Sequence, residues 1–414
     1  MGLHPEGATK RFVVLDGWRG IAALLVAAFH FQIYVSSHLQ ALAFVRHSWL
    51  FVDYFFVLSG FVIAATYGDR LPDWKSVRRF VLLRFGRIYP LHFAVLLLYL
   101  VGPATQGLAY IVMFLVGATT AGATPHITLP DSPESLVTNL FLVQSFGLHD
   151  RVTWNGPSWS ISAEFYTYLL FAAVAYLARA RLRLFLAVAV VPAPLIIGVL
   201  SPRLMNTTYD FGFIRCVYGF SIGVWLWTVY PELSQRLGRR LSDWRIATAV
   251  ETAALLFSIL FVARTGPTTT GLLAPFVFAI AVLIFSFEAG FVSRLLNARF
   301  FQLLGLYSYS IYMVHWFLKD EFLGLARIFD GTVRHGDHDY IATDLWRGDV
   351  LSLLFLGIVV VTSASTFVLI EKPSRDWFRR VARRPTSGAQ EAPHGDLAPR
   401  RLALRLIRSR FLLR

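Results

Sequence analysis

Two ionisable residues in the first apolar segment are spaced to act together. Arg19 lies at the start of the run and His30 follows eleven residues later, inside the segment IAALLVAAFHFQIYV. In an α-helix this spacing leaves the two side chains about 20° apart around the axis and about 16 Å apart along it. An ionisable side chain inside lipid costs several kcal/mol unless it faces protein or water, so the pair marks a candidate functional site. A guanidinium there can bind an anion, and an imidazole can transfer protons near neutral pH.

A second basic group precedes a later apolar segment. The stretch RRFVLLRFGRIYPLH contains Arg78, Arg79, Arg84 and Arg87. Arg84 and Arg87 are three residues apart, so on a helix they project together and can clamp phosphates, which the planar guanidinium fork binds well. The alternative is topological, because cytoplasmic loops of membrane proteins are generally basic.

The composition predicts an all-α, polytopic integral membrane protein that would position these residues. Of 414 residues 56% are hydrophobic and only 15% are charged, and the mean hydropathy is +0.56; soluble domains carry far more charge. Windows long enough to span the hydrocarbon layer predict about ten transmembrane helices. They lie at 20–39, 49–67, 91–116, 158–178, 184–200, 211–229, 246–263, 271–288, 301–318 and 350–370. The span 184–200 is the least regular, because Pro192 and Pro194 remove backbone donors.

The distribution of Lys and Arg predicts the orientation. With the N-terminus inside, the two termini and the even connections carry 30 Lys and Arg, the odd connections carry 8, and Arg215 lies within a span. The positive-inside rule therefore predicts that both termini are cytoplasmic. The same topology accounts for the net charge of +14, so we do not expect nucleic-acid binding.

Other sequence features narrow the class further. The one cysteine, Cys216, lies among apolar residues and indicates neither a disulfide nor redox chemistry. Loop histidines occur at His126, His149, His335 and His338, but their spacing matches no zinc pattern, so we expect no metal. We expect a membrane-embedded domain over 12–372 and a basic cytoplasmic tail over 373–414, which is partly disordered or forms an amphipathic helix on the leaflet.

Five segments, in order, resemble the integral-membrane acyltransferase family 3, whose members modify sugars, polysaccharides and some natural products. LDGWRGIAALLVAAFH is similar to the arginine–ten–histidine signature of that family, FVDYFFVLSGFVIA to its second span and RFGRIYPLH to its paired-arginine motif. WSISAEFYTYLLF and LGLYSYSIYMVHW fall where related motifs are expected. The resemblance covers roughly residues 12–372, and ordered agreement of several motifs is more specific than any one motif.

The resemblance implies an O-acyltransferase of a multi-pass cell membrane protein, in a bacterial inner membrane. The acyl group, usually acetyl, would pass from cytoplasmic acyl-CoA to a hydroxyl of a sugar, polysaccharide, glycolipid or small-molecule acceptor, with no bound cofactor. By carry-over, Arg19, Arg84 and Arg87 hold the CoA phosphates, and the pantetheine arm brings the thioester to His30. His30 then acts as general base; a covalent acyl-histidine is the less favoured variant.

Two carboxylates are candidates for supporting His30. Ser160, Glu164 and Tyr168 repeat every four residues and share a helix face. Glu164 either orients His30, binds acceptor hydroxyls or belongs to a hydrogen-bond network between helices. Asp53, near the outer end of the second predicted span, is a second candidate for fixing the imidazole tautomer.

Three further residues are secondary candidates. Ser308, Tyr312 and His315 form one polar face of the ninth predicted span. His315 suits acceptor binding, or it is an interfacial histidine beside Trp316. Arg215 either snorkels, pairs with an acid or contacts an anionic acceptor.

Transport is the main alternative to catalysis. Ten spans around buried charge also suit a secondary transporter or a flippase of a polar substrate without acyl-transfer chemistry. Transport predicts broken helices in repeated positions, whereas the acyltransferase hypothesis predicts that His30 and the arginines line one continuous cavity.

Overall fold

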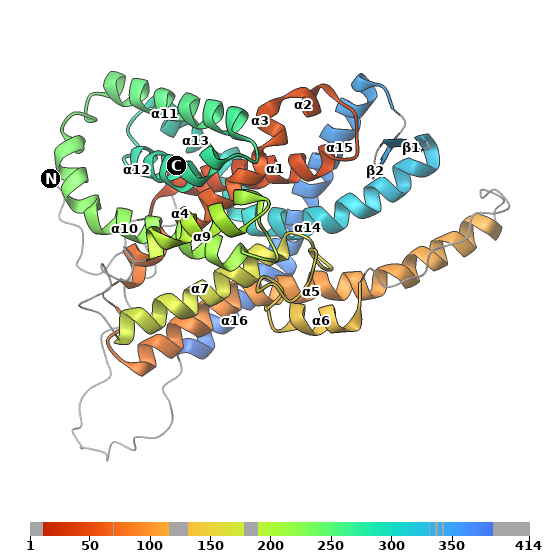
Figure 1. Ribbon diagram of the computed structural model, residues 1–414, viewed down its shortest axis with the longest axis horizontal. Helices are drawn as coiled ribbons and strands as arrows, with labels where there is room; N and C mark the ends of the chain where they lie inside the picture. Colours follow the sequence, from red (N-terminus) through yellow and green to blue (C-terminus); the bar gives the residue numbers. More distant parts are fainter. Residues whose placement is uncertain are drawn as a thin grey trace, which may run out of the picture.

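The computed structural model describes residues 11–68, 70–115, 131–177, 189–330, 332–335, 338–341 and 343–383. Helices make up almost all of it, and one short antiparallel pair of strands lies beyond the longest of the C-terminal helices (Figure 1). His126 lies outside the described residues.

The elements follow one another with short connections. The first half contains α1 (Val13–Gln32), α2 (His38–Ala41), α3 (Ala43–Arg46), η1 (Ser48–Leu50), α4 (Phe51–Tyr67), α5 (Trp74–Leu115), α6 (Pro133–Leu140), α7 (Ser158–Leu177) and α9 (Pro192–Leu200). The second half contains η3 (Leu204–Asn206), α10 (Gly212–Gly238), α11 (Trp244–Thr265), η4 (Thr269–Leu273), α12 (Ala274–Phe285), α13 (Phe291–Leu296), α14 (Arg299–Asp330), β1 (Thr332–His335), β2 (His338–Ile341), α15 (Leu345–Thr366), the π-helical turn η5 (Phe367–Glu371) and α16 (Lys372–Arg383).

Seven of the described helices are long and apolar enough to cross a membrane. They are 13–32, 48–67, 74–102, 158–177, 212–238, 244–265 and 345–383, and the apolar segment 269–285 is shorter. The predicted span 301–318 lies within the 32-residue α14, whereas the described part of the predicted span 184–200 is mainly the nine-residue α9, which begins at Pro192. The count of ten and the orientation of the termini stay predictions.

Burial separates central helices from peripheral ones. In the span that contains α4, 72% of the residues are buried, against 17% in α11. α11 turns Leu256, Phe257 and Leu260 outward, each at least 50% exposed. Exposed apolar side chains of this kind are expected where a helix meets lipid tails rather than water.

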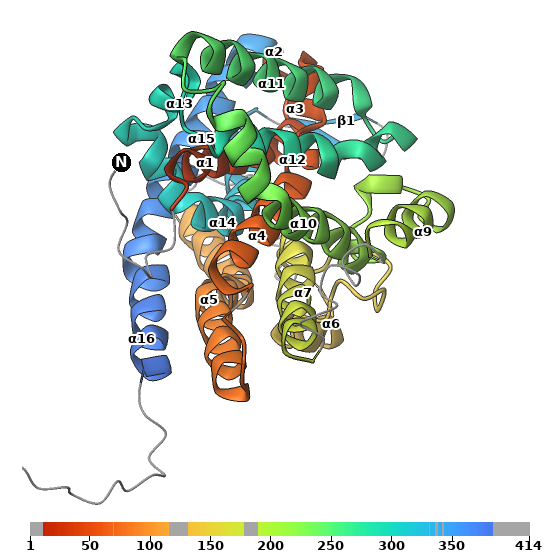
Figure 2. The ribbon, with the colours of Figure 1, turned by 90° about the vertical axis from the view of Figure 1, so that its left-hand side faces the viewer.

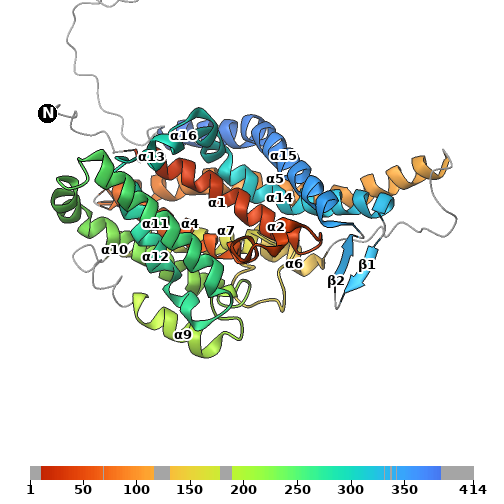
Figure 3. The same cartoon turned by 90° about the horizontal axis from the view of Figure 1, so that it is seen from above.

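α1 and α14 form the closest seam in the bundle. A Cβ atom on Gly20 would lie 2.5 Å from the backbone of Leu304 and Gly305, and one on Gly305 would meet the carbonyl oxygen of Asp16. Because neither glycine has a side chain, the two backbones approach closely, as is typical of helix pairs in membranes. Figure 3 shows the two helices next to each other, and the residue contacts show that they run in the same direction.

α5, α7 and α16 form a second group. In Figure 2 they project side by side below the rest of the bundle, with α5 between the other two. The first turn of α5 is capped by the Asp73 carboxylate, which accepts a 2.7 Å hydrogen bond from the Ser76 backbone amide. The Phe378 ring of α16 occupies the space that a side chain at Gly86 of α5 would need.

α16 continues α15 through the π-helical turn η5. That turn places the buried Glu371 so that it accepts a 3.0 Å hydrogen bond from the Ser310 hydroxyl and pairs with Arg375 at 3.2 Å. Such π-helical turns are frequent near functional sites. Residues 373–383, which we expected in the tail, thus form most of a packed helix, and 384–414 lie outside the described residues.

The seam between α1 and α14 yields a stability prediction. We expect Gly305→Ala to lower the melting temperature by about 3–6 °C, because the added methyl group forces the two backbones apart. Gly324→Ala in the same helix is the matched control, since nothing lies within 4 Å of that position. Thermal unfolding in detergent measures both, and equal melting temperatures for the two variants would contradict the role of the seam.

Candidate active site

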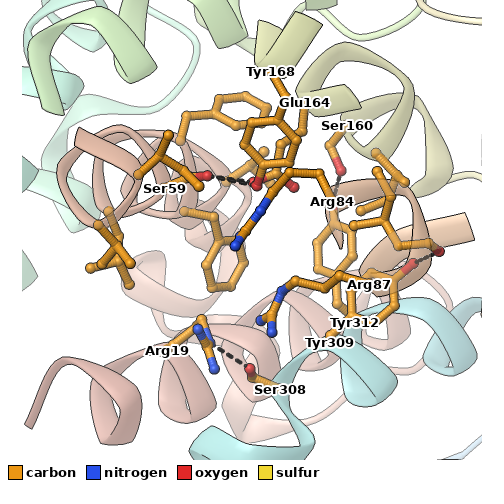
Figure 4. Close-up of a pocket in the computed structure, with 18 residues that line it drawn as sticks. Arg19, Ser59, Arg84, Arg87, Ser160, Glu164, Tyr168, Ser308, Tyr309 and Tyr312 are labelled. Atoms are coloured by element: carbon orange, nitrogen blue, oxygen red, sulfur yellow. Dashed lines mark hydrogen bonds between the residues drawn. The ribbon is translucent and has the colours of Figure 1, made fainter. Parts of the chain in front are cut away.

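A cavity of about 280 Å³ lies between five helices. α1, α4, α5, α7 and α14 all contribute polar side chains to it (Figure 4). These are Arg19, Ser59, Arg84, Arg87, Ser160, Glu164, Tyr168, Ser308, Tyr309 and Tyr312. The structure therefore brings together the three arginines and Glu164, which the sequence placed in separate motifs.

Arg19 is held on the α14 side of this cavity. Its Nε donates a 2.8 Å hydrogen bond to the Ser308 hydroxyl, and its Nη2 donates to the Gly305 carbonyl at 3.1 Å (Figure 4). Asp16, one helical turn earlier, lies 3.4 Å from the same guanidinium. These contacts fix the direction of the guanidinium and follow from the close approach of α1 and α14.

Glu164 lies on the opposite wall. Its Oε1 accepts hydrogen bonds from the Ser59 hydroxyl at 2.7 Å and the Tyr168 hydroxyl at 2.5 Å. The carboxylate is thus bonded to α4 and to its own helix face, and not to His30 as one of our sequence hypotheses required. The spacing of Glu164 and Tyr168 allows this bond, and Ser59 is a cavity residue that the sequence analysis missed.

Arg84 stands between Glu164 and the end of α5 that carries the other arginines. Its Nη2 donates to the Tyr67 hydroxyl at 3.3 Å, and its guanidinium carbon lies 5.3 Å from the centre of the Tyr67 ring. The buried Nε has no hydrogen-bond partner among the described residues. A buried donor left without an acceptor is unfavourable by about 1–3 kcal/mol, so this nitrogen is available to a ligand.

His30 and His315 form a pair next to the cavity. His30 Nδ1 lies 3.0 Å from His315 Nε2, and the two rings are stacked with their centres 5.1 Å apart. His315 is fully buried, whereas His30 is half-buried. The centre of the Tyr312 ring, in the cavity wall, lies 5.8 Å from that of His315. His30 itself is not among the residues that line the cavity.

The backbone sets the tautomers of the neutral pair. His315 Nδ1 lies 3.1 Å from the carbonyl oxygen of Ile311, which only accepts, so that nitrogen carries the proton. Nε2 of a neutral His315 must then accept a hydrogen bond from Nδ1 of His30. As a result Nε2 of His30 is unprotonated, which is the form that a general base needs.

Lys319 is a second residue that the sequence analysis missed. Its Nζ lies 3.6 Å from the centre of the Trp316 ring and 4.8 Å from that of Tyr34. The Trp316 ring lies 4.8 Å from the His30 ring. Lys319 follows His315 by four residues, so the helical period places it on the same face of α14, a signal that was present in the sequence.

Asp53 and Arg215 lie away from both groups and pair with each other. Arg215 donates from Nε to Asp53 Oδ1 at 2.9 Å and from Nη2 to Oδ2 at 2.7 Å, and both residues are buried. Its Nη1 also donates to the Thr207 carbonyl at 3.0 Å. Of the three roles we considered for Arg215, the structure shows pairing with an acid, and the acid is Asp53.

The histidines of the loops do not gather near the cavity. His149 Nε2 lies 2.7 Å from the Thr138 hydroxyl, and His335 and His338 oppose each other in the two-stranded sheet. In the described ranges no group of three His, Cys, Asp or Glu side chains is placed to hold a metal ion.

These features define the protein as a helical membrane protein with a charged cavity between its helices. Residues 12–370 match the family model of the acyltransferase 3 domain, described as an acyltransferase domain. Since the match covers most of the chain, the protein belongs to this acyltransferase family, whose members transfer groups other than aminoacyl groups.

Two curated relatives are similar to parts of the chain. Protein 2 in the picA locus of Rhizobium radiobacter is 34% identical over 170 residues, which cover 38% of this chain and 80% of that protein. The acyltransferase MdmB of Streptomyces mycarofaciens is 34% identical over 170 residues, which cover 39% of this chain and 38% of that protein. No solved structure matches the chain.

The buried ion pair gives a testable prediction. Arg215→Met leaves the Asp53 carboxylate buried without a partner, so we expect a loss of roughly 3–5 kcal/mol in the free energy of unfolding. Adding Asp53→Asn removes the isolated charge and restores part of that loss.

An exposed ion pair provides the control. Arg203, which lies 3.8 Å from Asp210 and is 40% exposed, is changed in Arg203→Met, for which we expect at most about 1 kcal/mol. Chemical unfolding in detergent measures all variants. A double variant no more stable than Arg215→Met would contradict the explanation.

Proposed function

We propose that the protein is a membrane-bound O-acyltransferase that moves an acyl group, most simply acetyl, from acyl-CoA to a hydroxyl of a sugar, glycolipid or related acceptor. The observation that carries this proposal is the cavity itself, in which three arginines and a carboxylate meet next to a histidine pair. Arginines suit the phosphates of CoA, and a half-buried imidazole with a free Nε2 suits proton transfer from a hydroxyl.

We propose that the arginine-rich end of α5 faces the cytoplasm, where acyl-CoA is made. The excess of Lys and Arg in the termini and even connections supports this orientation. Acyl-CoA would enter between α5 and its neighbours, pass Arg84 and Arg87, and extend toward Arg19 and Tyr312, which line the same cavity. The localisation that follows is a bacterial inner membrane.

His30 would act on the acceptor in one step. Its Nε2 takes the hydroxyl proton as the acceptor oxygen attacks the thioester carbonyl carbon, which gives a tetrahedral intermediate. The carbon–sulfur bond then breaks, the proton passes from the imidazolium to the CoA sulfur, and the products are an O-acyl ester and free CoA. Direct transfer of this kind requires no nucleophilic side chain from the protein.

His315 would be a positioning residue in this step. Its bond to the Ile311 carbonyl leaves Nε2 to accept from His30 Nδ1, and this contact fixes the tautomer and the ring direction of the base. Glu164 lines the cavity and would accept a further hydrogen bond from the acceptor or from a pantetheine amide. The pairing of Asp53 with Arg215 argues against a catalytic role for either residue.

The central test measures transfer directly. Purified protein in nanodiscs is incubated with radiolabelled acetyl-CoA and a panel of hydroxyl acceptors, and released CoA is titrated with a thiol reagent. The single cysteine, Cys216, is buried and adds little background. We expect His30→Gln to lower transfer by about 100-fold or more. His149→Gln, far from the cavity, is the matched control. Full transfer by His30→Gln would contradict the role of the base, and failure of the wild type to bind or consume acyl-CoA would contradict the proposed function.

Two substitutions separate positioning by His315 from simple packing. His315→Gln keeps an acceptor for His30 Nδ1, whereas His315→Leu keeps the bulk and removes the acceptor. We expect His315→Leu to lower kcat by about tenfold or more with an unchanged KM for acetyl-CoA, and His315→Gln to recover much of the rate. Equal rates for the Gln and Leu variants would show that the hydrogen bond is not what matters.

A further inference from the structure

A second cavity, of about 220 Å³, lies between α5 and α16 and is lined by arginines from both helices. Its lining contains six of them: Arg79, Arg84, Arg87, Arg375, Arg379 and Arg383. The other lining residues are Tyr67, Leu83 and Ala382, so no acidic side chain is among them. We call this space the basic cleft.

The spacing of the α16 arginines directs them to the cleft. Arg375, Arg379 and Arg383 repeat every four residues and so share one face of the helix. α16 is held against α5 by Phe378, whose ring lies where Gly86 leaves space and 5.9 Å from the Phe85 ring. The exposed Arg380 lies on the same helix but is not part of the cleft lining.

Positive charge in the cleft exceeds the acids that contact it. Arg375 pairs with Glu371 at 3.2 Å and Arg379 with Asp376 at 3.3 Å, and the second pair is exposed on both sides. Arg84 contributes the buried Nε without a hydrogen-bond partner in the described chain. Guanidinium groups held close together repel one another unless an anion lies between them. The arrangement therefore favours a multiply charged anion.

The basic cleft is continuous with the candidate active site. Arg84 and Arg87 line both cavities, so a ligand that lies between α5 and α16 can extend past them toward Glu164 and Arg19. Arg19, by contrast, lines only the inner cavity and is already bonded to Ser308. A long molecule with phosphates at one end matches this geometry.

We propose that the basic cleft binds the phosphates at the nucleotide end of acyl-CoA, and that α16 supplies Arg375, Arg379 and Arg383 as phosphate ligands together with Arg79 of α5. Arg84 and Arg87 stand where the phosphates give way to the pantetheine arm, and Arg19 acts further in. This inference rests on the proposed function, since it names where the donor of that reaction is held. It also makes α16 a part of the substrate site.

The experiment compares two donors that differ in their phosphates. Acetyl-CoA and acetyl-pantetheine share the thioester and the arm, but acetyl-pantetheine has no phosphate. Binding of acetyl-CoA and transfer from each donor are measured in nanodiscs of phosphatidylcholine for the wild type, for the double variant Arg379→Gln/Arg383→Gln and for the control Arg380→Gln. We expect the double variant to bind acetyl-CoA at least tenfold more weakly and to use acetyl-pantetheine as the wild type does, with Arg380→Gln unchanged.

The outcomes separate the two proposals. If the double variant binds acetyl-CoA as tightly as the wild type, α16 is not a phosphate ligand and the inference is overturned, while the proposed function stands. If the wild type neither binds acetyl-CoA nor transfers from either donor, the proposed function itself fails. A phospholipid headgroup carries the same phosphate chemistry. If the substitutions change retention of phosphatidylglycerol in mixed nanodiscs but not acetyl-CoA binding, the ligand is lipid and the inference is again overturned.

Discussion

The close parallel packing of α1 against α14 is the constraint on which the candidate site depends. Gly20 and Gly305 allow the two backbones to meet, and every polar contact along the seam follows from that approach. Near one end of the seam Arg19 reaches Ser308, and further along His30 reaches His315. In a lipid environment these polar groups must find partners inside the bundle, so the same contact stabilises the fold and orders the anion-binding and proton-transfer groups along one line.

The buried charges of this protein divide into two kinds. Asp53 and Arg215 satisfy each other with two short hydrogen bonds, and a further carbonyl completes the shell of the guanidinium. Such a pair is self-contained and leaves nothing for a ligand. Arg84 and the arginines of α16 face a common cleft in which acids are few. Unbalanced charge next to a cavity is the physical sign of a binding site, whereas balanced charge is a sign of structure.

Local spacing made much of this predictable from the sequence. The 3.6-residue period correctly placed Ser160, Glu164 and Tyr168 on one face, and hydropathy located the main apolar helices, with α5 beginning earlier than its predicted span because its first turns are rich in arginine. Tertiary pairing was not accessible. The bonds from Arg215 to Asp53 and from His315 to His30 join residues 162 and 285 positions apart, and no periodicity encodes such partners. The α16 arginines were assigned to a basic tail, because charge alone does not distinguish a topological signal from a cleft.

The most direct test of the central claim, that His30 is the base in acyl transfer from CoA, is a structure of the protein in nanodiscs with a non-hydrolysable acetyl-CoA analogue. The account predicts that the carbonyl carbon replacing that of the thioester lies within about 6 Å of His30 Nε2, the reach of one hydroxyl hydrogen-bonded to the base and in contact with the carbon. The phosphates should lie near Arg84 and Arg87. An analogue bound with its carbonyl on a different side of the bundle, away from His30, would contradict the account.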